Sequence, residues 1–264
     1  MDTRDLLIEI GTEELPPKAL QRLSQAFTAG ILEAFSRLGL SHGEVKSFAS
    51  PRRLALRVSE LVESQPDKQV ERKGPALKAA YDAQGNPTKA AEGFARSCGV
   101  AVSDLEVQKT EKGDWLVHRQ LQPGQTSLSL IPDLVEQSLA GLPIPKRMRW
   151  GSSDAEFVRP VHWLLFLHGN EVVDCKLLDT AAGNQSYGHR FHAPGNITIL
   201  HPTDYEPELR YRGKVIAGFE ARRDAIREQV DVTATSLKGH IDIDEELLDE
   251  VTALVEWPVP VAGS

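Results

Sequence analysis

One long amphipathic segment near the start of the chain constrains the fold more than any other feature. Apolar side chains recur there at steps of three or four residues: Leu20, Leu23, Phe27, Ile31, Phe35 and Leu38. This spacing places them on one face of a helix. Pro16 and Pro17 suit a first helical turn, and Gly39 is a typical C-terminal stop. The sequence therefore predicts a helix over residues 17–38 that must bury this face against a second layer.

Flanking segments predict that this second layer is a sheet. Asp5–Ile10 is a short apolar run ended by Gly11, and Arg53–Val62 alternates apolar with polar residues, as a half-buried strand does. Two more strands are predicted at Val161–Leu167 and Val172–Leu178, and late helices at Phe219–Val230 and Glu245–Val255.

The segment between these elements indicates a second lobe. Ser64–Pro75 is polar and broken by Pro and Gly, so we interpret it as a linker or an exposed loop. Helices are then predicted at Pro87–Cys98 and Leu128–Leu139, and a hairpin at Leu105–Lys109 and Trp115–Leu121 with its turn at Lys112–Asp114. We expect residues 64–142 to form a separable α+β unit, a candidate insertion into a first lobe of residues 1–63 that continues in 143–264. The expected fold class is α+β, with mixed sheets, packed helices and more than one lobe.

The charge distribution excludes wholesale binding of nucleic acid. The net charge is −8, and residues 231–264 hold eight acidic residues against one lysine, which leaves only −1 on residues 1–230. A localised face that binds phosphates remains compatible with this balance. No apolar run approaches the roughly 20 residues of a membrane span. The N-terminus does not resemble a secretory signal, so we expect a cytoplasmic protein without membrane contact.

Basic residues gather in two places. Lys146, Arg147, Arg149 and Arg159 flank Trp150 and Trp163 within nineteen positions, and Arg52 and Arg53 follow a proline at a strand start. Clustered Arg and Trp are typical of a surface that binds a polyanion or a partner protein. The alternative is structural, because a cation stacked on an indole also stabilises a fold. Arg222 and Arg223 alternate with acidic residues, and we interpret them as a solvated helix face.

Catalytic motifs are scarce. The chain has no glycine-rich phosphate loop, GxSxG, HExxH or paired CxxC. Glu13 and Glu14 follow a strand end, and they are either catalytic carboxylates or a charge complement to the next helix. His189 and His192 are three residues apart, but the glycine and proline around them favour a turn. We therefore predict no catalytic and no metal-binding residue. A small hydrolase that uses Glu13, Glu14 and nearby histidines remains an alternative, as does a non-enzymatic scaffold for protein partners.

Eight segments, in order along the chain, resemble the beta subunit of the bacterial two-subunit glycyl-tRNA synthetase. They are Leu7–Leu20, Phe48–Leu56, Lys73–Pro75, Lys89–Phe94, Pro143–Gly151, Phe157–Trp163, Gly188–Phe191 and Leu254–Pro258. The resemblance covers roughly the N-terminal third of the family's chain. It implies that the family's HD-type and anticodon-binding domains are absent from this sequence.

The resemblance also implies a function. In this α2β2 family the alpha subunit carries the class II active site that adenylates glycine with ATP, and the beta subunit contacts tRNA. The implied partners are the alpha subunit and tRNA(Gly), not DNA, and the chain itself is expected to bind no cofactor and to activate no glycine. The tRNA-binding candidates are Arg52, Arg53, Lys146, Arg147, Arg149, Arg159 and Arg190. An editing-type domain, similar to that of the phenylalanyl-tRNA synthetase beta chain, is a further alternative.

Overall fold

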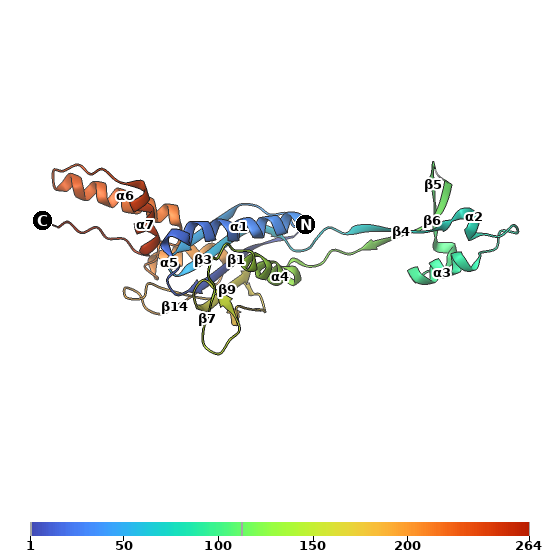
Figure 1. Cartoon of the computed structure of the whole chain (residues 1–264), viewed down its shortest axis with the longest axis horizontal. Coiled ribbons are helices and arrows are strands. Elements are labelled where there is room, and N and C mark those ends of the chain that lie inside the picture. The colour runs from blue at the N-terminus through green and yellow to red at the C-terminus, as the bar shows by residue number, and fades with distance from the viewer. Residues whose placement is uncertain (1, 112, 264) are drawn as a thin grey trace. The chain divides into compact units, whose positions relative to one another are not determined.

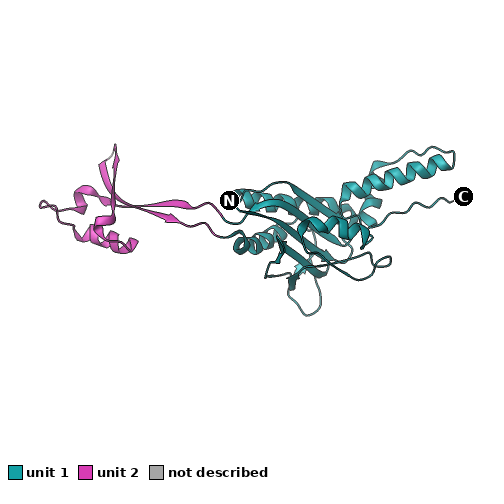
Figure 2. Ribbon diagram, turned by 180° about the vertical axis from the view of Figure 1, so that it is seen from behind, with its two compact units in different colours: residues 1–64, 126–264 teal, residues 65–125 magenta. Residues whose placement is uncertain are grey.

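The computed structural model of the chain describes residues 2–111 and 113–263, which form two compact units (Figure 2). Unit 1 comprises residues 1–64 and 126–264, and unit 2 comprises residues 65–125. Unit 2 is therefore an insertion, but it ends earlier than residue 142. Helix α4 (Ser127–Ala140) lies in unit 1, because Ile131, Leu134 and Leu139 are buried in the main core of that unit.

A seven-stranded sheet organises unit 1 (Figure 1). Its strand order is β11-β12-β9-β1-β3-β2, and the short strand β10 pairs with β9. The pairings are antiparallel except for that between β12 and β9. The strands are β1 (Thr3–Thr12), β2 (Val45–Ser50), β3 (Arg53–Val62), β9 (Val161–His168), β10 (Glu171–Val172), β11 (Lys176–Leu177) and β12 (Thr180–Gly183). The predicted strand at 161–167 thus pairs with β1 of unit 1.

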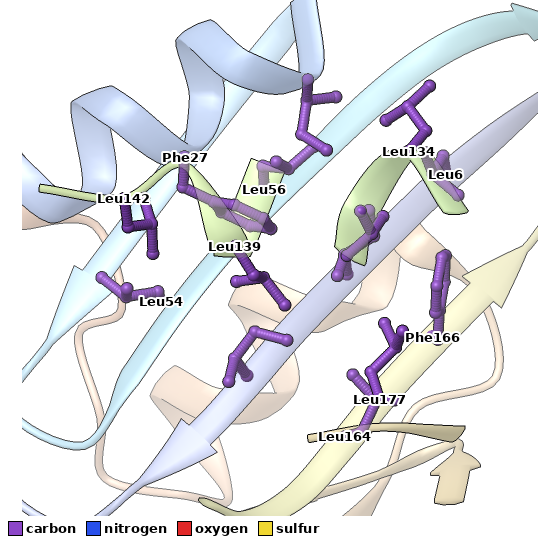
Figure 3. Packing of buried hydrophobic residues seen from close by; sticks show 14 of the residues in the cluster. Leu6, Phe27, Leu54, Leu56, Leu134, Leu139, Leu142, Leu164, Phe166 and Leu177 are labelled. Carbon is purple, nitrogen blue, oxygen red and sulfur yellow. The ribbon is translucent and has the colours of Figure 1, made fainter. Parts of the chain in front are cut away.

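Both faces of the sheet are covered at its centre. Helices α1 (Pro17–Leu38) and α4 pack on one face, where Figure 3 shows Phe27 and Leu139 beside Leu56. Leu6 and Ile8 of β1 point into this core, whereas Leu7 lies in a second core with helix α5 (Tyr205–Tyr211). Side chains alternate between the faces of a strand, so double coverage produces the unbroken apolar run of β1.

Helix α1 confirms the prediction from its periodicity, including both ends. Pro17 occupies the first turn, and Gly39 adopts a left-handed conformation with φ of 70°. The Gly39 amide donates to the Ser36 carbonyl, and the Leu40 amide donates to the Phe35 carbonyl. These bonds satisfy carbonyls that the helix end would otherwise leave unpaired.

Two expectations for unit 1 were wrong, and one strand was not predicted. Strand β3 is not half-buried, because Arg53 is buried and Ala55 lies in the second core. The single strand predicted at Val172–Leu178 is divided between β10 and β11, since the chain reverses after β11 and pairs that strand with β12. Strand β2 was missed altogether. The remaining elements of unit 1 are β7 (Met148–Arg149), β8 (Glu156–Phe157), β13 (Gln185–Tyr187), β14 (Asn196–Thr198), α6 (Phe219–Ser236) and α7 (Glu245–Leu254), with a 3-10 turn at Pro202–Asp204.

Unit 2 corrects the expectation of a linker at residues 64–75. Most of this segment is strand β4 (Lys68–Ala76), which pairs antiparallel with β6 (Gly113–Gln122). Its residues 68–73 are exposed, so a polar composition is compatible with a strand whose stability comes from the backbone ladder. Strand β5 (Glu106–Thr110) also pairs with β6, and Lys112 in the predicted turn lies outside the described residues. Helices α2 (Leu77–Ala80) and α3 (Lys89–Cys98) complete the unit, with a 3-10 turn at Val102–Asp104.

Among the described residues, every helix is too short or too polar to cross a lipid bilayer.

The insertion predicts that unit 2 can be excised. Ser64 and Thr126 form an antiparallel bridge, and the Ser127 amide donates to the Glu63 carbonyl at 2.8 Å, so the two ends of unit 1 lie side by side. Replacing residues 66–124 with a short Gly/Ser turn should leave unit 1 folded, with Tm within about 4 °C of the parent chain. Replacing residues 64–142 should unfold it, because the core side chains of α4 are lost. Circular dichroism melting distinguishes the two; equal behaviour would contradict the observed boundary.

Candidate functional site

Arg53 is a fully buried cation at the start of β3. Its Nη1 donates to Oε1 of Glu9 at 3.3 Å, and its Nη2 donates to Oε1 of Glu256 at 3.0 Å. The same guanidinium donates to Ser50 Oγ and to the Tyr187 carbonyl. These hydrogen bonds satisfy the donors of Arg53 and offset the cost of burying its charge, whereas Oε2 of Glu9 has no partner among the described residues. We call Glu9, Arg53 and Glu256 the buried charge triad.

The two carboxylates of the triad respond differently to burial. Burial raises the pKa of Glu9, even though Arg53 and hydrogen bonds from Ser186 and Trp163 act in the other direction. Burial also acts to raise the pKa of Glu256, but Arg53 and Arg52 outweigh it and hold that pKa below its usual value. Glu256 therefore carries the firmer negative charge opposite Arg53.

Gly11 leaves space for a tryptophan above the triad. It pairs with Arg53 of β3 on one side and with Trp163 of β9 on the other. A Cβ atom at Gly11 would lie 1.9 Å from Cε2 of Trp163, so only glycine permits this contact. The Trp163 indole donates from Nε1 to Glu9 Oε1 at 3.0 Å, which fixes the ring to the triad.

An open cleft of about 400 Å³ adjoins Trp163. Glu13 lies in it and accepts hydrogen bonds from Arg190 Nη2 at 2.8 Å and from His162 Nε2 at 2.9 Å. The hydrogen bond from Arg190 is the main reason that the pKa of Glu13 is lowered. The cleft is lined by Thr12, Glu13, Arg52, His162, Trp163, Tyr187, Gly188, Arg190, Pro194 and Gly195. It combines aromatic rings with both signs of charge.

The structure separates the predicted cationic residues into groups. Arg53 cannot contact RNA, because it is fully buried and forms ion pairs with Glu9 and Glu256. Arg52 and Arg190 line the cleft, where Arg190 also pairs with Glu14 at 3.1 Å. Arg159 donates to the Glu14 carbonyl at 3.0 Å.

The other three cations lie together at strand β7. Arg149 pairs with Glu156 at 2.8 Å and with Asp154 at 3.4 Å, and its side chain is 63% exposed. Arg147 donates to the Ala140 carbonyl at 2.8 Å. Lys146 is exposed and has no hydrogen bond or ion pair with any described residue. We call Lys146, Arg147 and Arg149 the β7 cation cluster.

The surroundings of Glu13, Glu14 and Arg222 differ from two further expectations. Glu13 and Glu14 bind Arg190, and no acidic residue occupies the first turn of α1. Arg222 is not on a solvated face. It is fully buried and donates to the carbonyls of Ala49, Ile216 and Thr252, because α6 packs against β2 and α7.

One pocket joining Glu13 to His189 or His192 would favour the hydrolase alternative, but the described residues place Glu13 and His189 in separate hollows. Glu13 shares its cleft with His162 but not with His189 or His192. His189 instead lines a separate hollow with Glu14 and Trp257. Within residues 2–111 and 113–263, no three His, Cys, Asp or Glu side chains gather in a way that could hold a metal ion.

Sequence reasoning missed Glu9 and Glu256. Glu9 stands in the middle of the apolar run that forms β1, and a charge inside a doubly covered strand requires a buried partner. That signal was present. Nothing local to Glu256 indicated that it meets Arg53, which is 203 positions away in the sequence.

Comparison with known proteins gives one consistent family. The family described as "Glycyl-tRNA synthetase beta subunit" matches residues 6–264. The chain is 53% identical over 264 residues to the glycine--tRNA ligase beta subunit of Marinobacter nauticus, and 53% identical over 263 residues to that of Hahella chejuensis. The corresponding protein of Salmonella newport is 48% identical over 259 residues. These alignments cover 98–100% of this chain but only 38% of each relative.

Removing the triad's cation should strongly destabilise unit 1. Arg53→Met leaves two carboxylates facing each other without a counter-charge, which should cost about 3–5 kcal/mol of unfolding free energy. Arg57→Met, on the same strand, is the matched control, because Arg57 is only partly buried and has no partner among the described residues. It should cost about 0.5 kcal/mol or less. Urea unfolding measures both; equal losses would show that the triad is not what Arg53 contributes.

The triad also predicts how stability depends on pH. Because the pKa of Glu256 is lowered from its usual 4.5, its stabilisation is complete above that value and is lost as pH falls through the lower folded value. Glu256→Gln should therefore destabilise the chain more at pH 7 than at about pH 4. Glu9 has the opposite sign, because its pKa is raised, so Glu9→Gln removes a cost that grows as pH rises above 4.5. Urea titrations at both pH values test this; identical pH profiles for the two variants would contradict it.

Proposed function

Because the chain belongs to the glycyl-tRNA synthetase beta subunit family, we propose that it forms the N-terminal part of a beta subunit. In this role it supports the attachment of glycine to tRNA(Gly) through contacts with tRNA and with an alpha subunit. The observation that carries the proposal is the family match from residue 6 to residue 264. The chain spans 38% of the length of the relatives that it matches, so activity, substrate and partners of the whole protein are part of the proposal.

We place adenylation of glycine, and the ATP that it uses, on the alpha subunit in the cytoplasm. One feature of the sequence supports this assignment of adenylation to the alpha subunit. The chain has no glycine-rich phosphate-binding loop motif. The contribution of this chain is then binding and positioning of tRNA rather than chemistry on glycine.

The β7 cation cluster is the part of the predicted tRNA face that remains available to phosphates. Strand β7 lies in a projecting loop of unit 1 (Figure 1). Lys146 is unpaired among the described residues, and the ion pairs of Arg149 are exposed. Exposed pairs of this kind are worth little in water, so a phosphate can replace the carboxylates. By contrast, the side chain of Arg190 is 44% exposed, against 63% for Arg149, and Arg52 is largely buried.

Neutralising this cluster should weaken tRNA binding without affecting glycine activation. In the full-length two-subunit enzyme, Lys146→Gln combined with Arg149→Gln should raise KM for tRNA. It should also reduce the slope of log affinity against log salt by about two, since each phosphate contact contributes about one. Glycine-dependent ATP–pyrophosphate exchange should be unchanged.

Lys238→Gln is the control for this experiment. Lys238 is also exposed and loses one of the two charges that the double variant loses, but it lies among the acidic residues of the 231–264 segment. It should leave both KM and the salt slope unchanged. If the double variant lowers exchange and charging together, the cluster supports the fold or the subunit interface instead of tRNA. If its salt slope equals that of the parent enzyme, the cluster does not bind phosphate.

A further inference from the structure

We propose that the cleft beside Trp163 binds one unpaired RNA base, which stacks on Tyr187 and is selected by Glu13 for an exocyclic amino group. This inference deepens the proposed function, because it rests on the chain being an RNA-binding protein. It concerns a different set of residues from the β7 cation cluster, so the two can fail separately.

Tyr187 provides a partly exposed aromatic ring that packs against a buried one. It ends strand β13, and its side chain is 38% exposed. Its ring centroid lies 4.9 Å from that of Trp163, which is only 8% exposed and is held by Glu9. A rigid aromatic ring open on one side is the usual platform for an unpaired base, since every base has an apolar face.

One wall of the cleft is a loop that is held in place by hydrogen bonds without a ligand. Residues 188–195 make a closed loop in which the Gly188 amide donates to the Gly195 carbonyl at 3.0 Å. A Cβ atom at Gly188 would lie 2.3 Å from the Ala193 carbonyl oxygen, so the close approach requires glycine. Arg52 donates to the Gly188 carbonyl at 3.0 Å and thereby ties the loop to β3. The volume of about 400 Å³ falls in the range of small-ligand sites.

The free acceptor capacity of Glu13 favours a base that carries a hydrogen-bond donor. Glu13 is ionised at neutral pH, because hydrogen bonding from Arg190 lowers its pKa. A carboxylate repels phosphate, but each of its oxygens has two lone pairs and accepts only one bond here. Adenine, cytosine and guanine carry an amino group that can donate to Glu13. Uracil has no amino group, and its N3–H donor lies between two carbonyl oxygens that repel a carboxylate, so uracil is disfavoured.

Binding of fluorescein-labelled tetranucleotides to the 264-residue chain tests the aromatic platform. Fluorescence anisotropy should show A4 and C4 binding, and a hairpin duplex of the same composition should not compete. Tyr187→Leu should weaken A4 by about tenfold or more, which is the typical loss of one stacking contact. Tyr187→Phe keeps the ring and should bind as the parent does. Tyr211→Leu is the matched control, because Tyr211 is 73% exposed at the end of α5 and outside the cleft.

Comparison of A4 with U4 tests selection by Glu13. U4 should bind at least about fivefold more weakly than A4, as expected for one lost hydrogen bond to a charged group. Glu13→Gln should reduce that difference to about twofold or less, because an amide can donate to uracil as well as accept. Thermal melting checks that each variant is folded.

Several results would overturn the inference. Absence of A4 binding to the parent chain, an A4 affinity equal for the parent and Tyr187→Leu, or equal affinities of A4 and U4 for the parent would each do so. Competition by inorganic phosphate alone would show an anion site instead. Binding of A4 that depends on Tyr187, together with an unchanged salt slope in the Lys146 and Arg149 experiment, would sink the proposed tRNA contact and leave the cleft intact. The reverse pair of results would sink the cleft alone.

Discussion

The fold of unit 1 depends on one buried cation held between two carboxylates. Arg53 joins Glu9 of β1 to Glu256 after α7, and its other donors reach Ser50 and the Tyr187 carbonyl. Removing three charges from water is costly, and the cost is offset only when every donor finds an acceptor. The triad thus requires segments from both ends of the chain to be correctly placed at once.

The triad also determines the floor of the cleft. Glu9 accepts from the Trp163 indole and from Ser186, and Trp163 in turn packs against Tyr187. The residues that would meet a ligand are therefore held by residues that no ligand can reach. Preorganisation of this kind reduces the entropy lost on binding. Above this floor, Glu13 and Arg190 remain exposed and able to exchange partners.

The arginines show why charge alone does not identify a nucleic-acid surface. Arg52 and Arg53 are neighbours in sequence, yet one lines a cleft and the other is sealed in the core. Arg222 is likewise buried among carbonyl oxygens, although acidic residues surround it in sequence. Among the described candidate cations, Arg149 of the β7 cation cluster is more exposed than Arg190, and its carboxylate partners are exposed as well. Burial, not composition, separates these roles.

The sequence by itself determined the elements with strong local signals. The helix at 17–38 follows from a period of 3.6 with proline at one end and glycine at the other. Strand β1 follows from its apolar run, although the strand does not end at Gly11 but continues to Thr12. The sequence also predicted an inserted unit and identified Arg52 and Arg190 as candidate tRNA-binding residues. Only the tertiary structure decided that β4 is a strand, that α4 completes the first core, and that Arg53 meets Glu256. The physical reason is range: helix periodicity and capping act over a few residues, whereas strand pairing and burial of charge depend on partners that the chain supplies from far away.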